Sequence, residues 1–404
     1  MLVIQILKWV LLGVEIVVAL PILYLCIVAT SAMLRARRRK KLAMAFPDAS
    51  ARFAILVPAH NETAVLNKLL TSLAALDYPT DSYTVCVVAD NCTDGTADLA
   101  RSSGLARVYE RFDEENRGKG FALRWLLQQL EQEQQVFDAY VVLDADSVVD
   151  SAFLKVMNYG LAQGARALQA HNTVLNVMDS PSTALRWLAL SLMNYVRPLG
   201  RNGLGCSSTL TGNGMCLSHA ILKSYPWQSF ALAEDYYYYL TLVQHGEKVL
   251  YMPEALVRSE MPLTFEQMRT QDIRWEASQG APSTWKTVWK LLKAGLRYRD
   301  RIRLEAIAEL LSPPLSNMIG LSLTVVVASV ILWSLSNVIV ALLLIGGVGY
   351  YISSAFFLLH PPRTIFRAFL SAPRFVLWKL WIVLVLKRGK KSQTEWVRTS
   401  RNAS

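Results

Sequence analysis

The chain has 404 residues, of which 53% are hydrophobic and 18% are charged, and its formal net charge is +11. Soluble domains contain about 25% charged residues, so this composition excludes a wholly soluble protein and predicts that part of the chain lies in lipid. Much of the positive charge clusters beside apolar runs, which favours an anionic membrane surface as its partner and predicts no binding to nucleic acid.

The first apolar run, from about Trp9 to Leu34, contains one charged residue and is long enough to span a bilayer. A signal peptide is the alternative, but it would be shorter and its positive charge would precede the run. Here six basic residues follow the run, from Arg35 to Lys41. We therefore predict an uncleaved transmembrane helix over 1–34 and a basic linker over 35–50. The protein is then multi-pass in the inner (plasma) membrane, with its N-terminus outside and the following domain in the cytosol.

Residues 51–280 are predicted to form a cytosolic α/β domain. Apolar runs such as Phe53–Val57, Tyr83–Ala89 and Ala139–Leu143 have the composition of strands, and helical patterns alternate with them. This alternation predicts a mostly parallel sheet with helices on its faces. Ligands bind such sheets at the carboxyl ends of the strands, so the polar residues that follow the strands form the candidate site.

The strand from Val85 to Ala89 ends at Asp90, where a carboxylate can accept hydrogen bonds from the base or ribose of a nucleotide. A turn or a helix cap is the alternative role for this residue. Further along, Asn116–Gly120 is a glycine-flanked basic loop that opens a predicted helix. Its backbone N–H groups and Lys119 would meet a phosphate there, although short loops of this kind are common.

Two carboxylates one residue apart follow the strand Val141–Leu143. Because side chains alternate along a strand, Asp144 and Asp146 are expected to point to the same side. Their oxygens suit Mg²⁺ or Mn²⁺ that a substrate phosphate also holds. A DxD pattern is weak evidence by itself. The prediction is strengthened by the other acidic residues that follow strands in the same domain.

Three further segments complete the candidate site. The small residues of Thr211–Cys216 allow close backbone approach, as an acceptor site or only a tight turn requires. Glu234 and Asp235 are adjacent carboxylates in an aromatic setting, where burial raises the pKa of at least one and suits it to act as a general base. The alternative is favourable acidic charge at a helix N-terminus, and both roles can hold together.

The third segment is Gln271-Asp272-Ile273-Arg274-Trp275. An arginine binds phosphate through its planar fork, and a tryptophan offers a flat face to a sugar ring. A surface helix whose tryptophan packs into the core is the alternative.

The rest of the chain is predicted to contact the membrane. Segments near 183–197 and within 281–312 combine Trp, Leu and basic residues and are predicted to be interfacial amphipathic helices, with ordinary packing helices as the alternative. Residues 313–360 hold two spanning candidates in a hairpin. Residues 361–386 are predicted to lie on the inner surface, and 387–404 to form a basic cytosolic tail. Three spans fit the charge clusters, whereas four would place the tail outside.

The ordered set of motifs resembles the family 2 inverting glycosyltransferases with an A-type nucleotide-sugar fold, particularly the membrane-embedded branch of cellulose, chitin and hyaluronan synthases. The resemblance covers nearly the whole chain. It is carried by Pro58-Ala59-His60-Asn61-Glu62, Asp90, Arg117-Gly118-Lys119-Gly120, Asp144-Ala145-Asp146, Thr211-Gly212-Asn213-Gly214, Glu234-Asp235 and Gln271-Asp272-Ile273-Arg274-Trp275.

The resemblance implies a role for each of these residues. Asp90 and Asp144 would contact the nucleotide, Asp146 would hold the metal and Asp235 would be the catalytic base. Gln271, Arg274 and Trp275 would form the QxxRW signature at the diphosphate and the acceptor, although Asp272 stands where many relatives carry Arg. The further substrate-binding residues implied are Glu62, Lys119, Gly212, Cys216 and Glu234.

We therefore expect a metal-dependent enzyme that transfers a hexose from a UDP-sugar to an acceptor hydroxyl, forming a β linkage from an α donor. The preferred product is a growing glycan that is fed into the membrane, with a homo-oligomer or an export partner left open. Transfer of one sugar to a lipid-linked acceptor is the nearest alternative. A transporter or pore subunit without catalysis and a hydrolase that uses two carboxylates are alternatives of other classes. The five cysteines lack metal-binding spacing and are expected to be reduced thiols.

Overall fold

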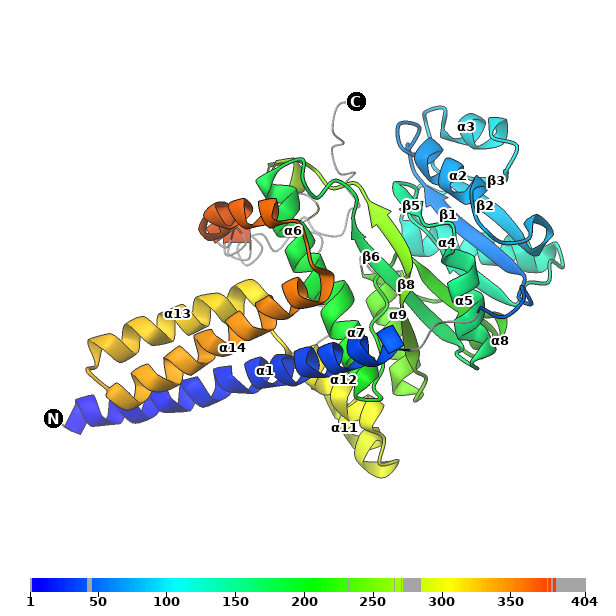
Figure 1. The fold of residues 1–404 in the computed structure, drawn as a ribbon. Helices are drawn as coiled ribbons and strands as arrows, with labels where there is room; N and C mark the ends of the chain where they lie inside the picture. Colours follow the sequence, from blue (N-terminus) through cyan, green and yellow to red (C-terminus); the bar gives the residue numbers. More distant parts are fainter. Residues whose placement is uncertain are drawn as a thin grey trace.

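The computed structural model describes residues 2–41, 46–230, 233–264, 266–269, 271, 285–375, 377–378 and 381–382. Within these ranges, a sheet domain with helices on its faces is joined to a bundle of long apolar helices (Figure 1). The bundle projects from one side of the sheet domain, and the N-terminus lies at its far end.

The strands form one mixed sheet in the order β3-β2-β1-β4-β7-β6-β8-β5. Within the described part of the chain, four of the seven strand pairings are parallel and three are antiparallel. The predicted α/β class with flanking helices is therefore confirmed. The strands are β1 (Phe53–Ala59), β2 (Tyr83–Asp90), β3 (Ala106–Arg111), β4 (Ala139–Val142), β5 (Ser147–Val149), β6 (Ala167–Val174), β7 (Met215–Ser218) and β8 (Val249–Ser259).

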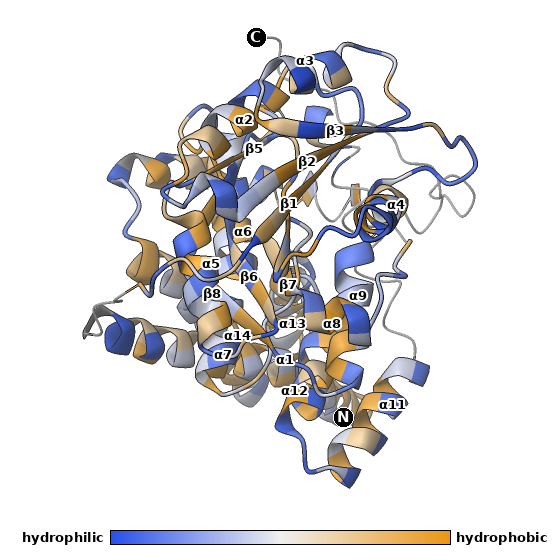
Figure 2. Ribbon diagram, turned by 90° about the vertical axis from the view of Figure 1, so that its right-hand side faces the viewer, coloured by the Kyte–Doolittle hydropathy of each residue, from blue (hydrophilic) through white to orange (hydrophobic). Residues whose placement is uncertain are grey.

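The central strands are buried on both faces because helices cover the sheet from both sides. Strands β1 and β2 carry an almost continuous run of apolar residues, which Figure 2 colours as hydrophobic. One face packs on helices α2 (Leu66–Ala74), α3 (Thr96–Ser102) and α5 (Phe153–Ala162). The other face packs on α4 (Lys119–Gln132), α8 (His219–Ser224), α9 (Glu234–Gln244), α11 (Trp285–Arg297) and α12 (Arg301–Leu311). The 3-10 turn η1 (Thr80–Ser82) leads into β2.

The bundle consists of three helices that pack against one another. They are α1 (Leu2–Lys41), α13 (Leu315–Ile331) and α14 (Leu335–Leu359). The buried Glu15 of α1 is held by Ser329 of α13, whose hydroxyl donates at 3.2 Å, and by the amide of Asn337 of α14 at 3.0 Å. Asn337 therefore lies inside α14 and links helices, while the turn of the predicted hairpin falls at Leu332–Ser334.

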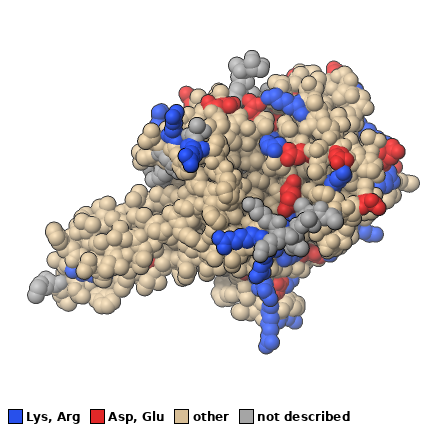
Figure 3. Space-filling model, viewed as in Figure 1, with Lys and Arg blue, Asp and Glu red and all other residues tan. Residues whose placement is uncertain are grey.

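Two helices in the described part are long and apolar enough to cross a membrane. They cover Leu2–Arg39 and Leu335–Leu359, with mean hydropathy 2.6 and 2.0. A third candidate arises if Arg301–Leu311 and Leu315–Ile331, which are bent by 63°, form one broken span. The projecting bundle carries almost no Lys, Arg, Asp or Glu on the face seen in Figure 3, as lipid contact requires. The number of spans and their orientation stay predictions.

The C-terminal end of α1 contacts the sheet domain through polar and small residues. The Arg39 guanidinium donates two hydrogen bonds to Glu254 of β8, at 2.9 and 2.7 Å. Ser31 donates to the carbonyl of Gly200 at 2.8 Å, and a Cβ at Gly200 would overlap the carbonyl oxygen of Val28. Gly200 thus allows α1 to lie directly against the helix that contains it.

That helix belongs to the segment that we predicted to be interfacial near 183–197. It forms α6 (Pro181–Ser191), the π-helical turn η2 (Leu192–Val196) and α7 (Arg197–Gly203). Most of its side chains are buried against α1, α14 and the 3-10 helix η3 (Arg363–Ser371). These contacts favour the packing alternative that the sequence left open, while contact of this segment with lipid headgroups stays a prediction.

Candidate active site

Three of the predicted site residues follow neighbouring parallel strands. Strands β2, β1 and β4 are adjacent, so their carboxyl ends lie at the same edge of the sheet. Asp90 ends β2, Glu62 lies just after β1 and Asp144 just after β4. The backbone N–H of Glu62 donates to the hydroxyl of Thr96 at 2.9 Å, which fixes the loop after β1.

Asp90 is buried and forms an ion pair that the sequence analysis missed. The Arg111 guanidinium, 5% exposed at the end of β3, donates to Asp90 Oδ1 at 2.6 Å. Burial raises the pKa of Asp90, and the hydrogen bond and charge of Arg111 oppose this rise. The register of β2 and β3 places Asp90 directly beside Arg111. An Arg at the end of the strand that follows Asp90 was the available signal in the sequence.

The ammonium of Lys119 joins two parts of the site. Lys119 is the first residue of α4, and its Nζ donates to Asp144 Oδ1 at 2.5 Å and to the carbonyl of Gly212 at 2.5 Å. Burial opposes the charged form of Lys119, but Asp144, Glu234 and Asp235 together raise its pKa. Lys119 therefore binds a carboxylate in this structure, where the sequence analysis expected it to meet a phosphate.

Gly212 brings the predicted base next to this ammonium. It has φ +74°, and a Cβ placed on it would lie 3.0 Å from Asp235 Oδ2 and 3.5 Å from Lys119 Nζ. Asp235 and Glu234 open helix α9, and the Asp235 carboxylate accepts a hydrogen bond from the N–H of Tyr236 at 2.8 Å. The structure thus brings together Lys119, Asp144, Gly212, Glu234 and Asp235, which come from four separate segments.

Burial raises the pKa of both adjacent carboxyl groups of α9. For Glu234, the negative charge of Asp235 raises the pKa further, and Lys119 opposes it. For Asp235, Lys119 and the N–H of Tyr236 oppose the rise, while Asp144 adds to it. A carboxylate whose pKa is raised is a stronger base than usual and can take a proton from a hydroxyl near neutral pH.

Asn213 supports the loop on which this cluster depends. Its side chain is 1% exposed and accepts from the N–H of Asp144 at 3.1 Å. Its amide donates to Ser147 at 2.8 Å and to Ser259 at 3.1 Å. Asn213 therefore ties the segment that contains Gly212 to the turn between β4 and β5, a role that a glycine-rich motif alone does not reveal.

The family resemblance implies a divalent ion at Asp146. Asp146 lies half-buried in the turn between β4 and β5, where the N–H of Ser147 donates to the carbonyl of Asp144 at 3.1 Å. No group of three or more His, Cys, Asp or Glu side chains is placed to hold an ion in the parts of the chain that are described. Mg²⁺ commonly uses only one or two carboxylates together with substrate phosphates, so the single carboxylate of Asp146 fits such an ion.

Two further predicted site residues, Cys216 and Gln271, show no contact with this cluster in the described part of the chain. Cys216 is fully buried in β7 within the hydrophobic core of the sheet, beside Val141 of β4. Its sulfur therefore cannot contact an acceptor, and its small apolar side chain serves core packing. Gln271 is half-buried, with no described contact to the cluster. Arg274 and Trp275 lie outside the described residues.

Residues 51–278, more than half of the chain, match the family described as "Glycosyltransferase like family 2". A "Beta-monoglucosyldiacylglycerol synthase" of Nostoc sp. is 29% identical over 248 residues, which cover 59% of this chain and 50% of that protein. A "Probable glucomannan 4-beta-mannosyltransferase 2" of Oryza sativa subsp. japonica is 24% identical over 247 residues, covering 59% of this chain and 42% of that protein.

The fold also matches a solved structure. A mannosyltransferase from Pyrobaculum calidifontis, solved in complex with GDP-Man and Mn²⁺, has a TM-score of 0.56 at 17% identity. The match covers 95% of this chain and 100% of that one, and at this identity it establishes the shared fold. The chain spans about half the length of the curated relatives named above.

Proposed function

Because the chain belongs to the family "Glycosyltransferase like family 2", we propose that it transfers a hexose from a UDP-sugar to an acceptor hydroxyl at a membrane, with inversion at the anomeric carbon. One observation carries this proposal. Lys119, Asp144 and Asp235 converge around Gly212 at the carboxyl edge of the sheet, which places a base of raised pKa beside groups that would bind a nucleotide sugar.

The donor would bind along the edge formed by β2, β1 and β4. Asp90, held by Arg111, would accept hydrogen bonds from the base or ribose of the nucleotide. Asp144 would contact the nucleotide next to Lys119, and the loop at Glu62 would close the site beside β1. Arg274 would bind the diphosphate through its planar fork, an assignment that depends on the sequence motif alone.

The transfer step follows from the position of Asp235. Its carboxylate would take the proton from the acceptor hydroxyl as the acceptor oxygen bonds to the anomeric carbon. The bond from that carbon to the diphosphate oxygen breaks on the opposite side, and UDP leaves. Mg²⁺ or Mn²⁺ held by Asp146 would, when bound, stabilise the negative charge on the departing diphosphate. Gln271, Trp275 and Glu234 would line the acceptor side.

A lipid-borne acceptor that receives a single sugar is the acceptor class that the geometry favours. Helices α1, α13 and α14 pack directly on one another, and Glu15 at their centre is fully buried and hydrogen-bonded to the other two. Such packing leaves no lumen between these three helices for a polymer. The similarity to a glycolipid synthase over 248 residues is consistent with this choice.

A polysaccharide product is the second candidate. The similarity to glucomannan mannosyltransferases favours it, and a pore would then have to form between copies of the chain or with an export partner. Incubation of the purified protein with radiolabelled UDP-sugars, followed by sizing of the products, separates the two candidates. One added sugar per acceptor supports the lipid acceptor, whereas a ladder of lengths supports the polymer.

The catalytic assignment is tested by Asp235→Asn. This change keeps the size of the side chain but removes the base, so we expect UDP release in the presence of acceptor to fall by at least about 100-fold. Binding of UDP, measured by calorimetry, should stay within about threefold, because the proposed donor contacts lie elsewhere.

Asp98→Asn is the matched control for this test, since the Asp98 side chain is 86% exposed on α3 and its carboxylate pairs with Arg101. It should retain full activity. Unchanged UDP release by Asp235→Asn would contradict the assignment of Asp235 as the base, and a wild-type protein that releases UDP from no sugar donor would contradict the proposed function.

A further inference from the structure

Helix α11 is joined to the protein by one narrow face. Val288, Leu291 and Gly295 are buried, and they pack against helices α9 and α12. Most of the remaining circumference is exposed. The Trp285, Trp289 and Leu296 side chains are 73%, 66% and 63% exposed, which is a large apolar area for a helix beside a folded domain.

The exposed residues of α11 form two parallel stripes. The first stripe is apolar, with residues spaced by four, three and four positions, so that they share one face of the helix. The second stripe repeats this spacing one residue later with basic side chains. The apolar stripe consists of Trp285, Trp289, Leu292 and Leu296, and the basic stripe of Lys286, Lys290, Lys293 and Arg297.

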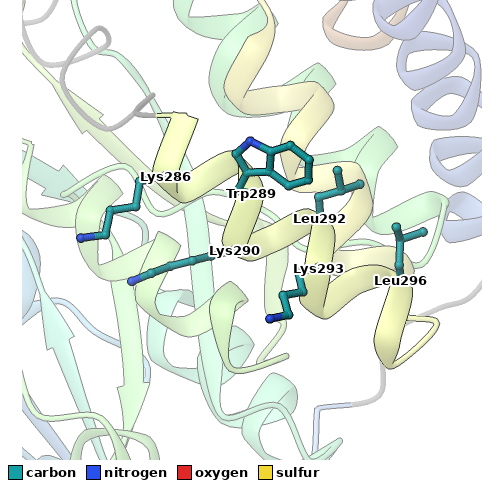
Figure 4. Close-up of a pocket in the computed structure, with 6 residues that line it drawn as sticks. All are labelled: Lys286, Trp289, Lys290, Leu292, Lys293 and Leu296. Atoms are coloured by element: carbon teal, nitrogen blue, oxygen red, sulfur yellow. The ribbon is translucent and has the colours of Figure 1, made fainter.

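The two stripes meet along a shallow hollow of about 670 Å³. Figure 4 shows the Trp289, Leu292 and Leu296 side chains on one side of the helix and the Lys286 and Lys290 side chains extended away from them. The hollow is open and lies entirely on α11, so it is a surface that a flat partner can cover and not an enclosed ligand site.

We propose that this face of α11 docks on the headgroup region of an anionic lipid bilayer, with the apolar stripe inserted between acyl chains and the basic stripe against the headgroups. The inference concerns membrane attachment of the sheet domain, and it does not depend on the proposed transfer reaction. The sequence indicated two candidate interfacial segments. The proposal concerns α11 because the other segment, α6–η2–α7, is mostly buried.

Charge and composition favour lipid over a protein partner. Helix α11 contains four basic residues and no acidic residue, which is the charge that complements anionic headgroups. Tryptophan is enriched at membrane interfaces because its ring is apolar and its N–H is polar.

The position of α11 in the chain agrees with this partner. Helix α12 follows after the turn at Tyr298–Asp300, and α13, which is part of a candidate span, begins only three residues after α12. The eleven residues of α12 rise about 16 Å, so α11 lies within about that distance of the entry point of α13 along the hairpin. The chain therefore tethers α11 close to the surface of the membrane that α13 enters.

The test places a fluorescent label on the apolar stripe of the full-length protein. Leu296→Cys, in a background where the half-buried Cys26 and Cys92 are replaced by Ser, would be labelled with bimane. The protein would be reconstituted in nanodiscs of phosphatidylglycerol or of phosphatidylcholine that contain a nitroxide on the acyl chain. We expect a blue-shifted emission and at least twofold stronger nitroxide quenching in the anionic discs.

Charge reversal distinguishes the contribution of the basic stripe to membrane docking from the contribution of apolar contact. Lys290→Glu with Lys293→Glu should reduce the quenching in anionic discs to the level seen in phosphatidylcholine, and the milder Lys290→Gln with Lys293→Gln should give an intermediate value. Arg107→Glu with Lys223→Glu is the matched control, because it makes the same charge change at exposed positions on β3 and α8. The control should leave the quenching unchanged.

Three results would overturn the proposal. A label that stays fully water-exposed in anionic discs would show that the face is free. A blue shift without nitroxide quenching would show that protein, such as a second copy of the chain, covers it. Equal quenching in both lipids, unaffected by charge reversal, would show that headgroup charge has no part in docking.

Discussion

At the scale of single residues, Gly212 holds a constrained position in the candidate site. Its φ of +74° is in the left-handed region, and the space beside its Cα is occupied by the carboxylate of Asp235 and the ammonium of Lys119. Two features of the site therefore require glycine at this position: the left-handed backbone conformation and the close approach of the Asp235 carboxylate.

The variant Gly212→Ala, compared with a suitable control, distinguishes the effect of backbone strain from the effect of displacing Asp235. A methyl group 3.0 Å from Asp235 Oδ2 must displace the carboxylate, so we expect kcat to fall at least tenfold. Gly104→Ala is the matched control, because Gly104 has φ +66° and open space around its Cα. Thermal unfolding should show a similar loss of stability for both variants, whereas turnover measurements should show the loss of activity for Gly212→Ala alone.

Arg111 illustrates a residue whose importance depends on its neighbour. It is buried at the end of β3, where it also donates to Asp113 at 2.7 Å and to the carbonyl of Asn116 at 2.8 Å. These bonds fix the loop that leads to Lys119 while the same guanidinium neutralises Asp90. A buried carboxylate without such a partner would favour its protonated form, so Arg111 keeps Asp90 available as an acceptor.

At the scale of elements, the start of α4 controls the electrostatics of the start of α9. Lys119 is the first residue of α4, and its charge lowers the pKa of both Glu234 and Asp235 against the effect of burial. The two helices therefore form one electrostatic unit, although more than 100 residues separate them in the sequence.

Lys119→Met should shift the pH dependence of the reaction. Without the ammonium the pKa of Asp235 rises further, so the base is protonated over a wider acidic range and activity is lost at a higher pH. We expect the acid limb of the kcat/KM profile to move upward by about 1 pH unit, the size typical for loss of one close charge.

The control for this prediction is Lys119→Arg, which keeps a positive charge at the start of α4 and should leave the acid limb near its wild-type position. An acid limb that does not move in Lys119→Met would mean that the titrating group is not the pair at the start of α9.

At the scale of the whole molecule, a buried polar network joins the apolar helices of the bundle to the sheet domain. Arg201 of α7 is fully buried and donates to both oxygens of Glu305 of α12, at 2.6 and 2.9 Å, and to the hydroxyl of Tyr239 of α9 at 2.7 Å. The hydroxyl of Tyr24 of α1 donates to the same Glu305 at 2.5 Å. Arg197 of α7 donates to the hydroxyl of Tyr351 of α14 at 3.0 Å.

Arg201→Met tests whether this network holds the two parts together. The change leaves Glu305 buried without its cation, and breaking a buried pair on one side typically costs about 3–5 kcal/mol. We therefore expect a clear drop in the unfolding temperature in detergent. Arg201→Met combined with Glu305→Leu should regain much of the loss, since no charge then remains unpaired.

Arg101→Met serves as the control, because Arg101 forms an exposed ion pair with Asp98 and should leave unfolding unchanged. A double variant that unfolds at the same temperature as Arg201→Met would show that packing around Arg201, and not its charge, stabilises the junction.

The sequence by itself determined the features that depend on local pattern. Apolar runs and their lengths predicted the strands, the α/β class and the long helices at both ends of the chain, because hydrophobic periodicity is a local property. Strand-end position predicted Asp90 and Asp144 as candidates, because parallel strands present their carboxyl ends at one edge. The aromatic setting of two adjacent carboxylates predicted Asp235. The motif order was sufficient to indicate the family that the comparison with known proteins then established.

Only the tertiary structure decided which of these residues meet and which amphipathic segments are covered. Lys119 was expected at a phosphate but bonds to Asp144, and Cys216 was expected at the acceptor but lies in the core. The segment at 183–197 and helix α11 have similar composition, yet one is buried by α1 and α14 while the other is exposed. Burial and charge pairing depend on partners that are distant in the chain, and no local pattern contains that information.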